Sequence, residues 1–276
     1  ITLLQQPFSL FQPGMLLSYG TVLGIYFLTP IFEEKLNLGQ KEDIWGKSIV
    51  NILRTFLASF SATITTLPIV LWSYYEVPTY SCLLNLLVMP FVTVVVGFGF
   101  MGALLGMVWT PFGQFFMGTV HYVLQYYEVL CGLNAQLPGA SWNPGQPLGW
   151  QLLIYYVGLG LFIILWRRRR GVYSLLLLLV LLVPRTKPAM EFTMLDVGQG
   201  DGLFIRSGGQ TMLMDGGSSD VKEVGKYRIR PFLKWHGTSK IDVICISHPD
   251  SDHVSGLLEL IENADAFGLD IGKVLL

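Results

Sequence analysis

The segment 247–253 places two histidines and two aspartates within seven residues, in the order Ser-His-Pro-Asp-Ser-Asp-His. The residues before it, 241–246, are apolar and rich in β-branched side chains, which predicts a buried strand. The residues from 257 onward predict the start of a helix. The segment is therefore expected to be a loop at the carboxyl end of a strand, where open α/β folds place their chemistry.

Imidazole nitrogens and carboxylate oxygens are ligands for Zn²⁺ and Mn²⁺, and a short loop can direct several of them toward one ion. A polar turn with ordinary helix capping is the alternative, because aspartate and serine are common at such positions. Capping gives no reason for two histidines, so the sequence favours a metal site. Its candidate ligands are His248, Asp250, Asp252 and His253.

This loop resembles the metal-binding motif of the metallo-β-lactamase superfamily, which reads His-x-His-x-Asp-His after a strand. His248, Asp252 and His253 match the motif, and Asp250 stands where its second histidine is usual. Replacing a nitrogen donor by oxygen shifts the preference toward Mn²⁺ or Mg²⁺ and away from Zn²⁺. The same aspartate variant occurs in ComEC-type DNA-internalisation proteins of bacterial competence, and the chain is similar to that branch.

The composition divides the chain into two parts. It is 52% hydrophobic and only 13% charged, whereas soluble domains carry about 25% charged residues. Residues 1–190 have a net charge of +4 and the remaining residues a net charge of −5. We therefore expect a membrane domain over 1–184 and a polar, acidic domain over 185–276.

Five to seven apolar membrane segments are expected in the first part. The arginine run 167–170 lies between the last two of them, and the positive-inside rule places that loop in the cytoplasm. Everything after Pro184 would then lie on the outer face, although the last segment is short for a full span. Pro90 is expected to split the long third region in two. The candidate segments are 15–32, 49–72, 81–109, 112–133, 150–166 and 171–183.

Two of these segments carry a polar stripe at helical spacing. Ionisable groups in membrane helices usually face a bundle interior or a water-filled path, which predicts a polar conduit. Helix–helix contacts through small and polar residues, or an interfacial amphipathic helix, would give the same pattern. The first stripe contains Asn51, Arg54, Ala58, Ser61 and Thr65. The second contains Gln114, His121, Gln125 and Glu128.

Two membrane segments strengthen the resemblance to ComEC-type proteins. Residues 11–24 are similar to the family's Gly-x-x-Leu-Ser segment that leads into an apolar span, and residues 84–90 to its Asn-Leu-Leu-x-x-Pro segment. Their order, followed by a metallo-β-lactamase-like segment, is more specific than either alone. The resemblance implies a polytopic α-helical membrane domain followed by an α/β (αββα) metallo-β-lactamase-like domain.

The second part opens with a linker, 184–188, and with alternating runs at 191–195, 203–206 and 211–214 that predict a hairpin-rich sheet. The glycine-rich turns 196–202 and 215–217 resemble segments that flank the metal loop in the family. The resemblance implies roles in orienting ligands or substrate. Turn capping is the alternative for these carboxylates. The candidates are Asp196, Gln199, Asp201 and Asp215.

The resemblance implies uptake of single-stranded DNA through an inner-membrane channel during transformation, together with other DNA-uptake machinery proteins. It also implies a nuclease-like domain that uses one or two Mn²⁺ or Zn²⁺ ions to degrade the other strand. His248, Asp250 and His253 would bind the first ion, and Asp252 would act in catalysis as a ligand of the second. The alternatives are a DNA-binding domain without catalysis and a membrane-tethered hydrolase of another substrate.

The sequence shown is expected to be a fragment that does not cut DNA by itself. Its soluble part holds too few residues for a complete domain of this kind, and no histidine follows His253. With three or fewer good ligands, a divalent ion would be held weakly. The soluble part is also acidic overall, so composition alone does not indicate DNA.

Overall fold

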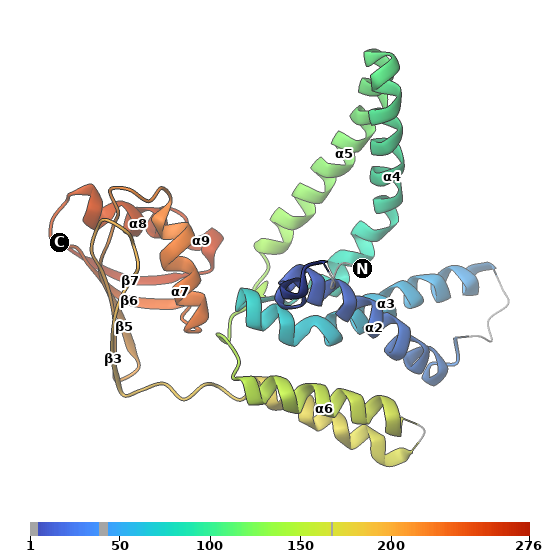
Figure 1. Ribbon diagram of the computed structural model, residues 1–276, viewed down its shortest axis with the longest axis horizontal. Helices are drawn as coiled ribbons and strands as arrows, with labels where there is room; N and C mark the ends of the chain where they lie inside the picture. The colour runs from blue at the N-terminus through green and yellow to red at the C-terminus, as the bar shows by residue number, and fades with distance from the viewer. Residues whose placement is uncertain (1–4, 39–43, 167) are drawn as a thin grey trace. The chain divides into compact units, whose positions relative to one another are not determined.

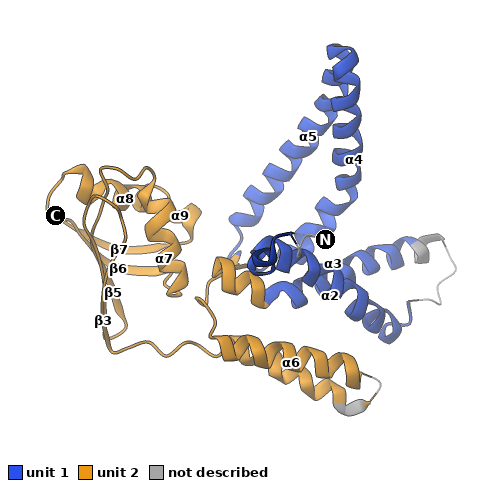
Figure 2. Cartoon of the chain, in the orientation of Figure 1, with its two compact units in different colours: residues 1–67, 78–140 blue, residues 68–77, 141–276 orange. Residues whose placement is uncertain are grey.

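The computed structural model describes residues 5–38, 44–166 and 168–276 of the chain. These residues form two compact units, one of residues 1–67 and 78–140 and the other of residues 68–77 and 141–276 (Figure 2). The boundary predicted at 184/185 separates apolar from polar sequence and stays a prediction. Arg167 of the arginine run lies outside the described residues.

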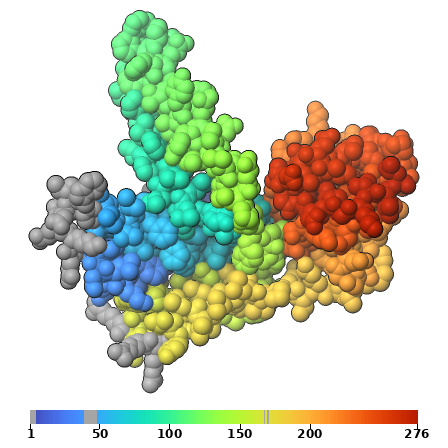
Figure 3. Space-filling view, turned by 180° about the vertical axis from the view of Figure 1, so that it is seen from behind, coloured from blue at the N-terminus to red at the C-terminus, as the bar shows by residue number. Residues whose placement is uncertain are grey.

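The first unit is helical. The short helix η1 (Pro7–Phe11) precedes α2 (Pro13–Lys35) and α3 (Ile44–Tyr74), and α4 (Ser81–Val108) and α5 (Thr110–Ala135) pair as a hairpin (Figures 1 and 3). Among the residues that the structure describes, three helices are long and apolar enough to cross a membrane, namely α2, residues 48–74 of α3, and α4. The chain is therefore a membrane protein.

Pro90 does not divide the third apolar region, contrary to expectation. The helix α4 is continuous through it. A proline removes one backbone hydrogen bond, and the turns on either side of it maintain the helix in an apolar setting. At Gly113 of α5 a Cβ atom would come within 2.6 Å of Gly106 Cα, so glycine permits the close packing of this hairpin.

The second unit contains an apolar hairpin of two helices. In it α6 (Gly149–Leu165) packs against η3 (Arg169–Leu182). Because η3 is a 3₁₀ helix, its fourteen residues extend over about 28 Å, close to the thickness of the hydrocarbon layer. The segment that is short for an α-helical span is thereby lengthened. At the open end of the hairpin, the Gln151 side chain donates to the carbonyls of Val180 (2.9 Å) and Val183 (3.0 Å).

A mixed five-stranded sheet forms the rest of this unit, in the order β3 (Met190–Met194), β4 (Gly202–Ser207), β5 (Gln210–Gly216), β6 (Lys240–Cys245) and β7 (Asp270–Leu275). The first three strands are antiparallel, as the hairpin pattern predicts. The pairs β5–β6 and β6–β7 are parallel. Their connections carry η4 (Gly225–Ile229), α7 (Arg230–Trp235), α8 (Ser251–Glu262) and α9 (Ala264–Phe267). A two-stranded sheet of β1 (Val77–Pro78) and β2 (Ser141–Trp142) completes the described strands.

The helices cover one face of the large sheet. Phe204, Leu213 and Ile244 face them from three neighbouring strands and are fully buried with Leu233 and Leu257. This core anchors α8, whose first turn carries part of the predicted metal loop.

Apolar side chains on the opposite face of the sheet are exposed in the described part of the chain. Strand residues alternate between the two faces, so Phe192 and Met194 of β3 point away from the helices and share this face with Met214 of β5 and Leu275 of β7. Proteins commonly cover exposed apolar surfaces with further structure or with a partner.

Candidate metal centre

The register of two parallel strands brings two loops together. Met214 of β5 lies opposite Cys245 of β6, so the residues after both strands emerge side by side at the carboxyl edge of the sheet. Asp215 stands at the end of β5, and Ser247 follows β6 by two residues. The helix α8 begins at Ser251, which confirms the predicted order of strand, loop and helix. It begins six residues before the predicted start, so Asp252 and His253 lie in its first turn and not in the loop.

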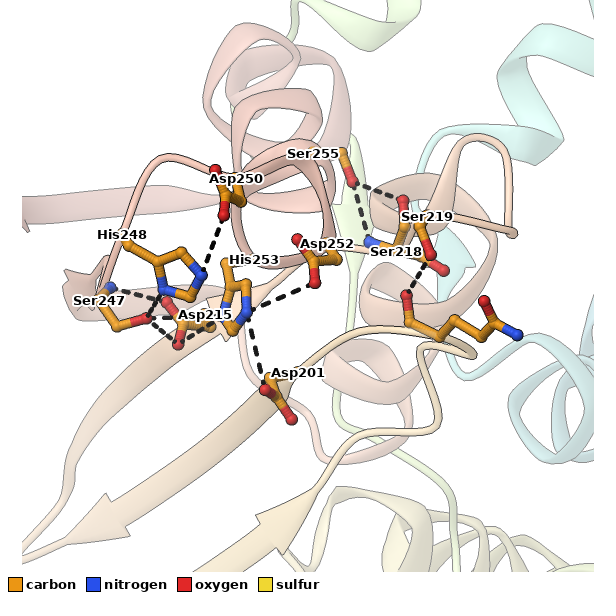
Figure 4. Close-up of polar contacts among 11 residues, drawn as sticks. Asp201, Asp215, Ser218, Ser219, Ser247, His248, Asp250, Asp252, His253 and Ser255 are labelled. Carbon is orange, nitrogen blue, oxygen red and sulfur yellow. Dashed lines mark hydrogen bonds and ion pairs between the residues drawn. The ribbon is translucent and has the colours of Figure 1, made fainter.

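Asp215 is the buried anchor of this edge. It accepts hydrogen bonds from the backbone N–H of Ser247 (2.8 Å), from the Ser247 hydroxyl (2.7 Å) and from Nδ1 of His253 (3.2 Å) (Figure 4). Burial alone would raise the pKa of Asp215, but the hydrogen bonds from Ser247 and His253 outweigh burial and lower it. An ionised Asp215 only accepts, so it keeps the proton of His253 on Nδ1 and leaves Nε2 free to bind an ion.

His248 and His253 lie against each other, with ring centroids 3.7 Å apart. One ligand atom each from His248, Asp252 and His253 can be chosen so that all lie within 4.8 Å of one another. The set of two imidazoles and one carboxylate fits a divalent first-row ion, and these three residues would hold it. Asp252 Oδ2 lies 3.6 Å from His253 Nε2, and Asp201 Oδ2 lies 3.8 Å from the same atom (Figure 4).

Asp250 has a different position from the other three predicted ligands. Its exposed carboxylate is 3.6 Å from His248 Nε2, and it is not among the three residues whose ligand atoms converge. Its place as a ligand of the first ion stays a prediction.

The glycine-rich turns fit against the start of α8 at two points. A Cβ atom on Gly217 would collide with the backbone of Asp252 and His253, and one on Gly200 would collide with the carbonyls of Gly217 and Asp252. Backbone hydrogen bonds from Asp201 N to Asp252 O (3.1 Å) and from Gly217 N to Asp201 O (3.3 Å) connect the same segments. The two glycines therefore let three segments approach closely enough to set the metal loop.

The other predicted orienting residues are divided between the site and the surface. Asp201 and Asp215 lie beside His253. Asp196 is exposed and pairs with Arg228 at 2.9 Å, while Gln199 contacts the turn 218–220 through its backbone. Sequence reasoning missed Ser247, which bonds to Asp215 and contacts His248 Nδ1 at 2.9 Å. Its position directly before the first histidine was the available signal.

The two polar stripes of the membrane part are partly exposed. Arg54 is exposed and its Nε lies 3.5 Å from Glu33 Oε1, whereas Ser61 and Thr65 of the same stripe are buried. Thr29 donates to Ser61 at 3.1 Å, so this end of the stripe joins α2 to α3. A channel-lining role for the exposed candidates stays a prediction. These are Asn51, Arg54, His121, Gln125 and Glu128.

Comparison with known families agrees with these features. A family model described as "Competence protein" matches residues 1–169, more than half of the chain. The chain belongs to the competence protein family. A second model, the metallo-β-lactamase superfamily, matches residues 195–266, which contain the candidate metal centre. The resemblance found in the sequence is thereby confirmed.

One curated relative is the ComE operon protein 3 of Bacillus subtilis (strain 168), which is 23% identical over 278 residues. The match covers 92% of this chain and 34% of the relative, so the chain spans about a third of that protein's length. No solved structure matches the chain.

Metal binding by this competence protein should strengthen as pH rises. The hydrogen bond with Asp215 raises the pKa of His253, burial opposes this, and the charges of Asp252, Asp215 and Asp201 add to it. A raised pKa means that protonated His253 stabilises the metal-free fold fully below the unfolded value of about 6.5, and that this stabilisation is lost as pH rises through the folded pKa. Over the same pH interval a metal ion no longer competes with a proton for Nε2 of His253. Mn²⁺ titrations from about pH 5.5 to 8.5 measure this, and a pH-independent affinity would contradict it.

The substitution Asp215→Asn should reduce Mn²⁺ affinity by about 10–100-fold, the usual effect of losing a carboxylate that orients a histidine ligand. It preserves the side-chain shape and removes the charge that fixes the His253 tautomer. It should also lower the pKa of His253, which NMR titration of the ring protons can follow. Asp265→Asn, at an exposed position of α9, is the matched control and should change neither quantity.

Proposed function

We propose that this competence protein forms part of a membrane channel that takes up single-stranded DNA, and that its metallo-β-lactamase-like domain cuts phosphodiester bonds in the strand that is not transported. The observation that supports the nuclease role most is the convergence of His248, Asp252 and His253 beside the buried Asp215. The apolar helices of the competence domain support the membrane role.

A divalent ion at this site would act as a Lewis acid that balances the charge of a phosphate group. The residues of the chain prepare the site for that role. Asp215 holds the proton on His253 Nδ1, and Ser247 supports both Asp215 and the ring of His248. Asp201 adds negative charge near His253 Nε2. Two imidazoles and one carboxylate are compatible with both Mn²⁺ and Zn²⁺.

The test of this function is incubation of purified full-length protein with end-labelled double-stranded DNA and Mn²⁺, with and without a chelator. The proposal expects cleavage that requires the ion. Binding of DNA without cleavage would favour a non-catalytic DNA-binding domain. Metal-dependent hydrolysis of other phosphoesters or esters, with DNA left intact, would favour a tethered hydrolase of another substrate.

We place the metallo-β-lactamase-like domain on the outer face of the plasma membrane, because the arginine run 167–170 favours the cytoplasm. The test is labelling by an impermeant maleimide after Cys82, Cys131 and Cys245 have been replaced by serine. A cysteine introduced at position 222 should react on intact cells. One introduced at position 168 should react only after permeabilisation, and the reverse pattern would contradict this orientation.

A further inference from the structure

A second candidate binding site lies at the end of the sheet away from the metal centre. A cavity of about 530 Å³ lies near the start of β6, and an adjoining one of about 240 Å³ shares Lys187, Pro188 and Arg206 with it. The metal centre occupies the opposite, carboxyl end of the same strand. We call the two cavities together the basic groove, because four cations line it. They are Arg185, Lys187, Arg206 and Lys240.

Two of these cations face a carboxylate within the groove. Arg206 is buried and its Nη1 lies 3.4 Å from Glu191 Oε2, and Lys240 Nζ lies 3.0 Å from Asp242 Oδ1. The other two make different contacts. Arg185 lies over the ring of Trp235 at 5.2 Å, and Lys187 donates to the carbonyl of Gly237 at 3.3 Å. The groove therefore carries net positive charge.

The cations of the groove act on one another. Burial lowers the pKa of Lys187, and the charge of Arg206 lowers it further, against the opposing effect of Glu191. Burial likewise lowers the pKa of His236 at the same place; the charge of Glu191 opposes this, and Arg206 and other nearby cations add to it. His236 Nε2 is also buried without a hydrogen-bond partner among the described residues. An anion bound in the groove would relieve this repulsion.

The groove is built at the open end of the α6–η3 hairpin. Residues 144–146 line it just before α6 begins, and residues 185–188 line it just after η3 ends. At this end the Gln151 side chain of α6 donates to the carbonyls at the end of η3. Trp235 donates from Nε1 to Gln146 Oε1 at 2.6 Å. The groove is thus a few residues from both apolar segments, at the level where cations and tryptophans meet lipid headgroups.

We propose that the basic groove binds the phosphate of an anionic phospholipid headgroup and so holds the metallo-β-lactamase-like domain at the membrane surface. The position of the groove favours a headgroup over a DNA strand. The groove is lined by the residues that directly precede α6 and directly follow η3, a place that a lipid headgroup reaches from the bilayer. The proposal is independent of whether the metal centre cuts DNA.

The test is a lipid titration of the delipidated full-length protein in detergent, read by native mass spectrometry. Phosphatidylglycerol should bind at least about tenfold tighter than phosphatidylcholine. The double variant Arg185→Gln and Lys187→Gln should lose about thirtyfold in affinity for phosphatidylglycerol, as expected for two interfacial cations. Lys222→Gln with Lys226→Gln removes the same charge from exposed positions outside the groove and should bind as the unaltered protein does.

The charge-conserving variant Arg185→Lys with Lys187→Arg should bind phosphatidylglycerol nearly as well as the unaltered protein, which keeps the test valid if the glutamine variant fails to fold. Equal affinity of the glutamine variant and the control would overturn the proposal, and so would loss of binding in the charge-conserving variant. Displacement of phosphatidylglycerol by micromolar inorganic phosphate would reassign the groove to a free anion. Displacement by a short single-stranded oligonucleotide would reassign it to DNA.

Discussion

Replacing Asp252 or His248 by alanine should reduce Mn²⁺-dependent DNA cleavage by the full-length competence protein by about a thousandfold or more. Each substitution removes one of the three donors that converge in the structure. A divalent ion contributes several kcal/mol of charge stabilisation to phosphoryl transfer, and every 1.36 kcal/mol corresponds to tenfold in rate. The measurement is the initial rate of cleavage of end-labelled double-stranded DNA at saturating Mn²⁺.

Glu262→Ala is the matched control for this experiment, because it removes an exposed carboxylate from the other end of the same helix α8. Its cleavage rate should equal that of the unaltered protein. If the Asp252 and His248 variants also cut at the unaltered rate, the metal centre described here is not the site of cleavage.

A single methyl group at Gly217 should weaken metal binding as strongly as the loss of an orienting carboxylate, by about 10–100-fold. The Cβ atom of Gly217→Ala would collide with the backbone of Asp252 and His253 at the start of α8. Backbone atoms cannot turn aside as a flexible side chain does, so the helix must shift and carry two of the converging donors with it. Overpacking of this kind also destabilises a fold by about 1–3 kcal/mol.

Gly149→Ala provides the comparison, because a Cβ atom there would meet nothing within 4 Å. It should leave both Mn²⁺ affinity and thermal stability unchanged. Isothermal titration and thermal unfolding of the two variants separate the effects. A Gly217→Ala variant that binds Mn²⁺ as tightly as the Gly149→Ala variant would show that close packing at Gly217 does not set the metal loop.

The local order of the metal loop was predictable from the sequence. The apolar run 241–246 corresponds to β6 within one residue at each end, and a loop and a helix follow it in the predicted order. The helix was expected from residue 257 but begins at Ser251, so Asp252 and His253 lie in its first turn. The hairpin of β4 and β5 was equally clear, because alternating side chains and two adjacent glycines are local signals. These features depend on neighbouring residues alone, which is why a single sequence contains them.

Which of the nearby carboxylates face the histidines was not predictable. Asp196 and Asp201 belong to the same glycine-rich turn, yet only Asp201 lies beside His253, while Asp196 pairs with Arg228. The choice depends on how that turn packs against Gly217 and the first turn of α8, which are distant in sequence. The close approach of Gly200 and Gly217 to the backbone of α8 also depends on residues distant in sequence, so it was equally unpredictable.

The membrane part shows a similar limit. Proline usually marks a boundary, but the continuous apolar surroundings of Pro90 preserve the helix α4. The reach of the last apolar segment depends on its 3₁₀ geometry. Residue counting that assumes the α-helical rise underestimates it.

Electron paramagnetic resonance of Mn²⁺ bound to the full-length protein tests the metal centre most directly. The structure predicts electron–nuclear couplings from imidazole nitrogens of two histidines, His248 and His253, because both donate to the converging set. Alanine at either position should remove one of these couplings and weaken the binding. A bound Mn²⁺ without nitrogen couplings, or one whose spectrum is unchanged in both alanine variants, would contradict the assignment of this loop as the metal site.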